Sequence, residues 1–119
     1  LKTLSQATEQ EVFDQVAEHL LKQKQKSEII DDTRTSRGCR YKTSGDLKCA
    51  AGCLISDDEY NEKMEGLEWG GLVMRGVVPA THDVLIDKLQ FIHDSNFINE
   101  WKYALQNLAE SYKLEWKFN

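Results

Sequence analysis

Residues 39–66 decide how this chain is expected to fold, and they read CRYKTSGDLKCAAGCLISDDEYNEKMEG. A turn sequence, Thr-Ser-Gly-Asp at positions 43–46, separates two short segments and predicts an antiparallel β-hairpin. A three-residue loop would place Cys39 opposite Cys49. A four-residue loop would put these thiols on opposite faces, because side chains alternate along a strand. The sequence leaves both registers open.

The second half of this stretch predicts the start of a helix. Ser56 is followed three residues later by Glu59, which is the spacing of a capping box. The acidic side chains at 57–59 suit the positive end of a helix dipole, and Gly66 is expected to end the helix. Before it, the small residues at 50–52 would let another part of the chain approach closely, and they suit either a strand end or a short helix.

Hydrophobic residues recur at helical spacing near the N-terminus. Thr8 and Glu11 have the spacing of a capping box and predict where this helix begins. The apolar residues that follow lie on one face of a helix, which predicts that this face is buried. They are Val12, Phe13, Val16, Ala17, Leu20 and Leu21.

The C-terminal half predicts two further helices after an irregular connection. Residues 67–80 contain three glycines and the single proline, and they are expected to hold one short strand at most. Thr81 is expected to cap the first helix and Ser95 or Asn96 the last, and the short link predicts antiparallel packing. The last helix is expected to present Phe97, Trp101, Ala104, Leu105, Leu108 and Tyr112.

Length and composition indicate one domain over residues 1–119. We expect an α+β fold that is mainly helical, with one small antiparallel β-hairpin packed on three or four helices. No apolar run approaches the ~20 residues that cross a bilayer, and the first residues lack the apolar core of a secretory signal. Three cysteines cannot form a complete disulfide framework, which favours a reducing compartment such as the cytoplasm.

The net charge of −5 is concentrated in one segment. Residues 57–69 carry six acidic side chains and one lysine. A nucleic-acid-binding protein needs a basic surface to neutralise phosphates. The basic residues that could form one adjoin the acidic segment, so direct nucleic-acid binding is disfavoured. These residues are Arg34, Arg37, Arg40 and Lys42.

The three cysteines allow an alternative function, a cysteine-based enzyme or a zinc-binding protein using Cys39, Cys49 and Cys53. A zinc site would add one of the three histidines as a ligand, but the spacing lacks the paired cysteines of common zinc motifs. A nucleophilic thiolate would need an aligned histidine base, and nothing in the sequence aligns one. We therefore expect buried structural thiols, no catalytic residue, no bound metal and no cofactor.

The acidic segment also contains aromatic and apolar residues, a combination that suits a protein-binding surface. Calcium is a weaker interpretation because the spacing and glycine of an EF-hand loop are missing. The sequence thus predicts a partner-binding surface. It consists of Asp57, Asp58, Glu59, Tyr60, Glu62 and Glu65. The C-terminal Trp116 and Phe118 leave a homodimer contact open as well.

Several motifs carry a resemblance that extends over most of the chain. The central one is Leu-Lys-Cys-Ala-Ala-Gly-Cys-Leu-Ile at 47–55, preceded by Cys39-x-Tyr41 and followed by Tyr60 and Met-Glu-Gly at 64–66. Leu-Gln-x-Ile-His-Asp at 89–94 lies further along. On these motifs the chain resembles a family of small uncharacterised proteins from bacteria and their phages.

This resemblance implies a biological setting but no catalytic activity or catalytic residue. It implies a compact accessory protein of a phage or prophage that acts in the cytoplasm of its bacterial host. Small phage accessory proteins frequently bind and block host proteins, including nucleases of antiviral defence. We therefore expect a protein that binds a host protein and inhibits it, with an antiviral-defence nuclease complex as the partner class.

Overall fold

The computed structural model describes residues 4–26, 28–30, 37–43 and 47–118, and the side chains of 28–30 and 37–39 lie outside this description. The described residues contain four α-helices: α1 (Glu9–Gln23), α2 (Trp69–Met74), α3 (Asp83–Ser95) and α4 (Trp101–Ser111). They also contain the 3-10 helices η1 (Leu4–Gln6), η2 (Gly52–Leu54), η3 (Glu62–Met64) and η4 (Ile98–Glu100). The two strands are β1 (Glu28–Ile30) and β2 (Arg37–Cys39).

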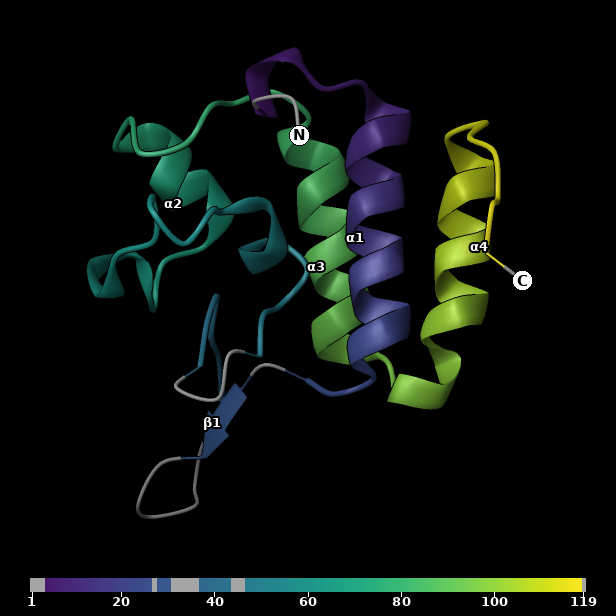
Figure 1. The fold of residues 1–119 in the computed structure, drawn as a ribbon, viewed down its shortest axis with the longest axis horizontal. Helices are drawn as coiled ribbons and strands as arrows, with labels where there is room; N and C mark the ends of the chain where they lie inside the picture. The colour runs from purple at the N-terminus through teal and green to yellow at the C-terminus, as the bar shows by residue number, and fades with distance from the viewer. Residues whose placement is uncertain (1–3, 27, 31–36, 44–46, 119) are drawn as a thin grey trace.

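Helices α1, α3 and α4 lie side by side and contact one another (Figure 1). Helices α3 and α4 run in opposite directions, as their short link predicts. Helix α2 packs on α3, and η2 packs on α1. The core lies among these elements. Its large, fully buried side chains include Phe13, Leu20, Leu72, Leu89, Trp101 and Leu105.

Helix α1 confirms the N-terminal prediction. The Thr8 hydroxyl accepts the Glu11 N–H at 3.1 Å, and the Glu11 carboxylate accepts the Thr8 N–H at 2.9 Å, which completes the capping box. Lys24 ends the helix in a left-handed conformation with φ of 52°. The expected apolar face is buried at Val12, Phe13, Val16, Ala17 and Leu20.

Helices α3 and α4 form where helical spacing predicts them, but their caps differ from the prediction. The N-cap of α3 is His82, with φ of 58°, and not Thr81. Helix α3 continues through Ser95, so this residue cannot cap the next helix. Helix η4 intervenes and leaves the Phe97 side chain 76% exposed, whereas Trp101 is buried as predicted.

The predicted α+β class is wrong. The chain is mainly helical, as expected, but among the described residues the strand pair predicted on either side of 43–46 does not form. Residues 44–46 lie outside the described chain, and the segments beside them share one antiparallel bridge, Lys42 with Lys48. This pairing matches neither expected register. Cys39 instead lies in β2 opposite Glu28. This three-residue strand pair makes no sheet layer for the helices to pack on.

The small residues after Cys49 explain why the second hairpin strand is absent. The Cys53 N–H donates to the Cys49 carbonyl at 3.1 Å, which coils the chain into a turn that leads into η2. Gly52 lies so close to Tyr41 that an added Cβ would be 2.0 Å from the Tyr41 carbonyl oxygen. Close approach of these two backbone segments replaces strand pairing.

Two further local predictions are also wrong. The predicted helix after Ser56 stops after one turn, because Asn61 takes an extended conformation with φ of −143° and starts η3. The expected strand in 67–80 is absent, and α2 forms there despite Gly70 and Gly71. Burial of Trp69 and Leu72 against the core stabilises this helix and outweighs the weak helix propensity of glycine.

Candidate functional site

The predicted partner-binding surface is tied into the fold at Glu65, whose side chain is only 13% exposed. Its Oε1 accepts the Tyr41 N–H at 2.9 Å and its Oε2 accepts the Lys42 N–H at 3.2 Å. The Tyr60 hydroxyl donates to Oε2, and the Arg40 guanidinium lies 3.7 Å away. Burial and this hydrogen bond raise the pKa of Tyr60. Glu65 therefore holds two chain segments together instead of facing a partner.

Basic side chains offset two more of the predicted acids. The Asp57 carboxylate lies 3.1 Å from both the Lys42 and the Lys48 ammonium groups. Hydrogen bonds from these lysines lower the pKa of Asp57. Glu62 pairs with Arg40 at 3.0 Å while remaining largely exposed. The acidic excess visible in the sequence is thus reduced by three basic residues that precede it in the chain.

The remaining acids are the ones that face outward. The Glu59 carboxylate accepts the Ser56 hydroxyl at 2.9 Å and so stabilises its own turn. Asp58 is exposed and makes no side-chain hydrogen bond or ion pair among the described residues. The structure brings the six predicted residues into one region, but only Asp58 is left wholly to solvent.

The described cysteines are in surroundings that disfavour reactivity. Cys49 is fully buried, and its sulfur accepts the Gly52 N–H at 3.3 Å. The Cys53 thiol is enclosed, although the residue as a whole is only partly buried, and it donates to the Ala50 carbonyl at 3.1 Å. Burial raises the pKa of Cys53 to about 12, which keeps it protonated and poorly nucleophilic near neutral pH. The Cys39 side chain, and with it any Cys39–Cys49 contact, lies outside the described residues.

The histidines have structural partners. His19 and His82 each place Nε2 near a backbone carbonyl, at 2.8 and 2.7 Å, so both nitrogens donate. Burial lowers the pKa of His19. His93 is buried, lies 2.7 Å from the Asp94 carboxylate and stacks on Trp101. Among the described residues, no three metal-ligating side chains are grouped so that they could hold an ion.

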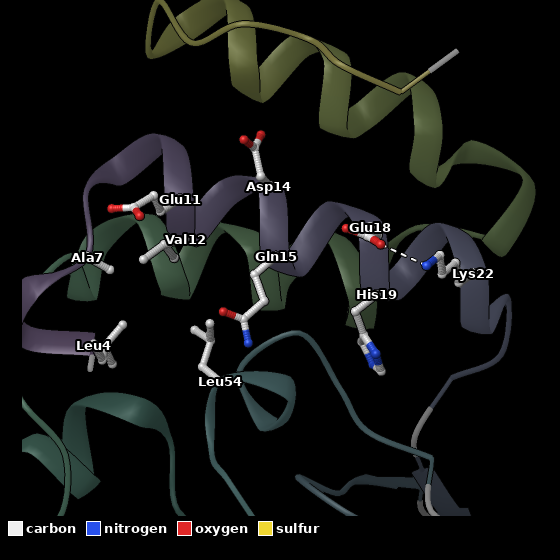
Figure 2. Close-up of a pocket in the computed structure, with 10 residues that line it drawn as sticks. All are labelled: Leu4, Ala7, Glu11, Val12, Asp14, Gln15, Glu18, His19, Lys22 and Leu54. Carbon is white, nitrogen blue, oxygen red and sulfur yellow. Dashed lines mark hydrogen bonds and ion pairs between the residues drawn. The ribbon is translucent and has the colours of Figure 1, made fainter. Parts of the chain in front are cut away.

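A cavity of about 480 Å³ is lined by residues of η1, α1 and η2 (Figure 2). Several of its polar side chains have partners within the chain. Glu11 completes the capping box, the Gln15 amide donates to the Cys53 carbonyl at 3.0 Å, and Glu18 pairs with Lys22 at 2.7 Å. The capping box and the Glu18–Lys22 pair stabilise α1 itself, and the Gln15 contact joins α1 to η2. These side chains do not form a nucleophile–base pair.

The outer face of α3 is the surface that sequence reasoning missed. A groove of about 570 Å³ runs between α3 and α4, and its lining is mainly apolar. Val84 is 58% exposed and Phe91 is 66% exposed on its α3 side. Ile92 and Leu108 lie deeper in the groove. The available signal was the spacing of Val84 and Phe91, seven residues apart and out of phase with the buried positions of α3.

No match to this chain was found among protein-family models, curated proteins or solved structures. Within the part of the chain that the structure describes, no helix has both the length and the apolar character needed to cross a bilayer. The candidate site therefore depends on the geometry of this chain alone. Its strongest element is the exposed apolar face of α3 and the groove beside it.

Proposed function

We propose that this chain is a non-enzymatic accessory protein that binds another protein through the outer face of α3. The observation that carries the proposal is the pair of exposed apolar side chains, Val84 and Phe91, beside the α3–α4 groove. Exposed apolar side chains rimmed by charge mark protein-binding surfaces, and Asp87 and Lys88 supply that charge here.

An apolar anchor from the partner would gain affinity by leaving water for this groove. The floor is formed by Ile92, Ala104 and Leu108, and Phe91 stands at its edge. Large aromatic side chains at the centre of an interface commonly dominate its binding energy. Phe91 is therefore the residue whose loss should weaken binding most.

The surroundings of the cysteines support a role other than catalysis. A nucleophile needs a thiolate and a base that touches it. The Cys53 pKa of about 12 opposes the first requirement. The hydrogen bonds that His19 and His82 make to backbone carbonyls oppose the second.

The biological setting is proposed from the family resemblance. The resemblance supports the interpretation of this chain as a phage or prophage protein. In that role the protein would bind and inhibit a host protein in the cytoplasm of the bacterial host. An antiviral-defence nuclease complex is the partner class to test first. The excess of acidic residues makes direct nucleic-acid binding a poor competitor, and a homodimer through the same groove is the competing assembly.

The test is a comparison of Phe91→Asp with Phe97→Asp in capture from host lysate, followed by affinity measurement with the purified partner. Both substitutions place a charge on an exposed phenylalanine, but Phe97 does not line the groove. We expect Phe91→Asp to weaken binding at least about thirtyfold, which is typical of an interface hot spot, and Phe97→Asp to change it little.

A second pair of variants tests the acidic residues predicted from the sequence. Asp58→Lys with Glu59→Lys should leave affinity within about threefold if the α3 face is the contact surface. Equal loss in both phenylalanine variants, or loss only in the acidic variant, would reject the α3 surface. Light scattering of the purified chain separates a homodimer from a heterologous complex.

A further inference from the structure

A second hollow, of about 480 Å³, also has Phe91 in its lining. It lies where the start of α2 meets α3, and we call it the α2–α3 cleft. The residues that matter for its chemistry are Tyr41, Glu68, Trp69, Asp87, Phe91 and Asp94. Phe91 and Asp87 line both this cleft and the groove, so a partner seated in the groove reaches the cleft directly.

Two acidic side chains of the cleft, Glu68 and Asp87, lack a basic partner among the described residues. Glu68 and Asp87 make no ion pair or side-chain hydrogen bond among the described residues. The neighbouring Lys88 does not neutralise them, because its ammonium lies over the Tyr112 ring, 5.0 Å from the centroid. Burial raises the pKa of Asp87, and the nearby carboxylates of Asp83 and Glu68 add to the effect. The cleft is thus a site of unneutralised negative charge.

Aromatic rings line the same cleft. Phe91 is 66% exposed, so its ring has an open face on which a cation can stack. Trp69 is 3% exposed, and its indole N–H has no acceptor among the described residues. Trp101 and Trp116 share this lack of an acceptor, but neither lines the cleft. A buried N–H without an acceptor is unfavourable. The Trp69 nitrogen is covered by protein atoms, so a ligand carbonyl would remove this cost by displacing them.

We propose that the α2–α3 cleft binds an arginine side chain of the protein partner. The guanidinium pairs with Glu68 and Asp87 and stacks on Phe91, and a neighbouring main-chain carbonyl of the partner accepts the Trp69 N–H. Arginine fits better than lysine because its planar group stacks on aromatic rings and forms paired hydrogen bonds to carboxylates. This inference rests on the proposed function and names the chemistry that the partner must carry.

The test is an NMR titration of the full chain, labelled with ¹⁵N, with the peptide N-acetyl-Gly-Arg-Gly-amide. The Trp69 indole resonance, assigned by its loss in Trp69→Phe, reports on the cleft without any partner protein. A saturable shift is expected at roughly millimolar affinity, as suits a ligand of this size. The same peptide with citrulline, a neutral isostere of arginine, should bind at least about tenfold more weakly.

Two variants locate the binding. Asp87→Asn should weaken the arginine peptide about tenfold, and Glu110→Gln, which removes an equal charge from an exposed position outside the cleft, should not. Propylguanidinium carries the same single charge without the carbonyl and should bind more weakly than the peptide. Tighter binding of propylguanidinium would assign the cleft to a small free cation and overturn the partner assignment. Equal binding of the citrulline peptide, equal effects of the two variants or the lack of a saturable shift would overturn the site itself. The comparison of Phe91→Asp with Phe97→Asp tests the proposed function independently of these results.

Discussion

Glu65 and Asp58 belong to one acidic segment, yet their side chains have different roles. Glu65 accepts two backbone N–H groups and a tyrosine hydroxyl, and so it joins the 40–42 segment to the chain after η3. Asp58 is exposed and contacts solvent. Charge counted along a sequence does not distinguish these roles, because the two backbone N–H groups and the guanidinium that contact Glu65 come from residues more than twenty positions earlier.

Removal of Glu65 should be costly for the fold. Glu65→Ala leaves two N–H groups without their acceptor, and we expect the free energy of unfolding to fall by about 2–4 kcal/mol. Glu62→Ala is the matched control, since that side chain is 80% exposed and its ion pair should contribute under about 1 kcal/mol. Urea denaturation measures both. A similar small loss in the two variants would contradict the anchoring role of Glu65.

Asp57 should make stability depend on pH. Its pKa is lowered in the folded chain by Lys42 and Lys48, so its contribution is present above the unfolded pKa of about 3.9. That contribution is lost as the pH falls through the folded pKa. The stability difference between wild type and Asp57→Asn should therefore shrink on acidification, and it should also shrink in high salt because Asp57 is exposed. A difference that grows in acid would contradict this assignment.

Cys53 should react slowly with alkylating reagents. With a pKa of about 12, its thiolate fraction at pH 8 is about a thousandfold below that of an ordinary thiol. Iodoacetamide labelling followed by mass spectrometry measures the rate at each cysteine separately. Rapid modification of Cys53 in the native chain would revive the cysteine-based enzyme as a candidate.

Among the elements, the turn from Cys49 through η2 is the one that decides between hairpin and helical packing. It places Gly52 against the backbone of Tyr41, a contact that leaves no room for a side chain. Helix α2 shows the opposite case, because Gly70 has open space around its Cα. These two glycines therefore have different structural requirements.

The two glycines give a matched pair of substitutions. Gly52→Ala should destabilise the fold by at least about 3 kcal/mol, since its Cβ would be 2.0 Å from a backbone oxygen. Gly70→Ala should instead stabilise it by ~0.5–1 kcal/mol, because alanine has the higher helix propensity. Thermal unfolding of both variants measures these changes in stability. Tolerance of alanine at Gly52 would mean that this backbone contact is not present in solution.

Helices α1, α3 and α4 could be predicted because their apolar residues repeat at helical spacing and each buries one face. The fold class could not be predicted correctly, because Tyr41 and Gly52 approach through tertiary contact and not through a local pattern. The candidate surface on α3 was also missed. Val84 and Phe91 lie in a helix whose buried stripe explained its hydrophobicity, and their exposure depends on how α4 packs beside it.

At the scale of the whole molecule, the structural contacts and the candidate site use different hollows. The cavity beside α1 is lined by side chains that hold η2 and the capping box. The groove and the α2–α3 cleft meet along one ridge of α3, at Asp87 and Phe91. A single partner could therefore place an apolar anchor in one hollow and a cationic group in the other.

The most direct measurement of the central claim is an NMR map of the ¹⁵N-labelled chain with its purified partner. We expect the largest shifts at Val84, Phe91 and Leu108, which border the groove, with small changes at Asp58 and Glu59. Shifts centred on residues 57–62, with α3 unchanged, would contradict the claim that the outer face of α3 is the binding surface.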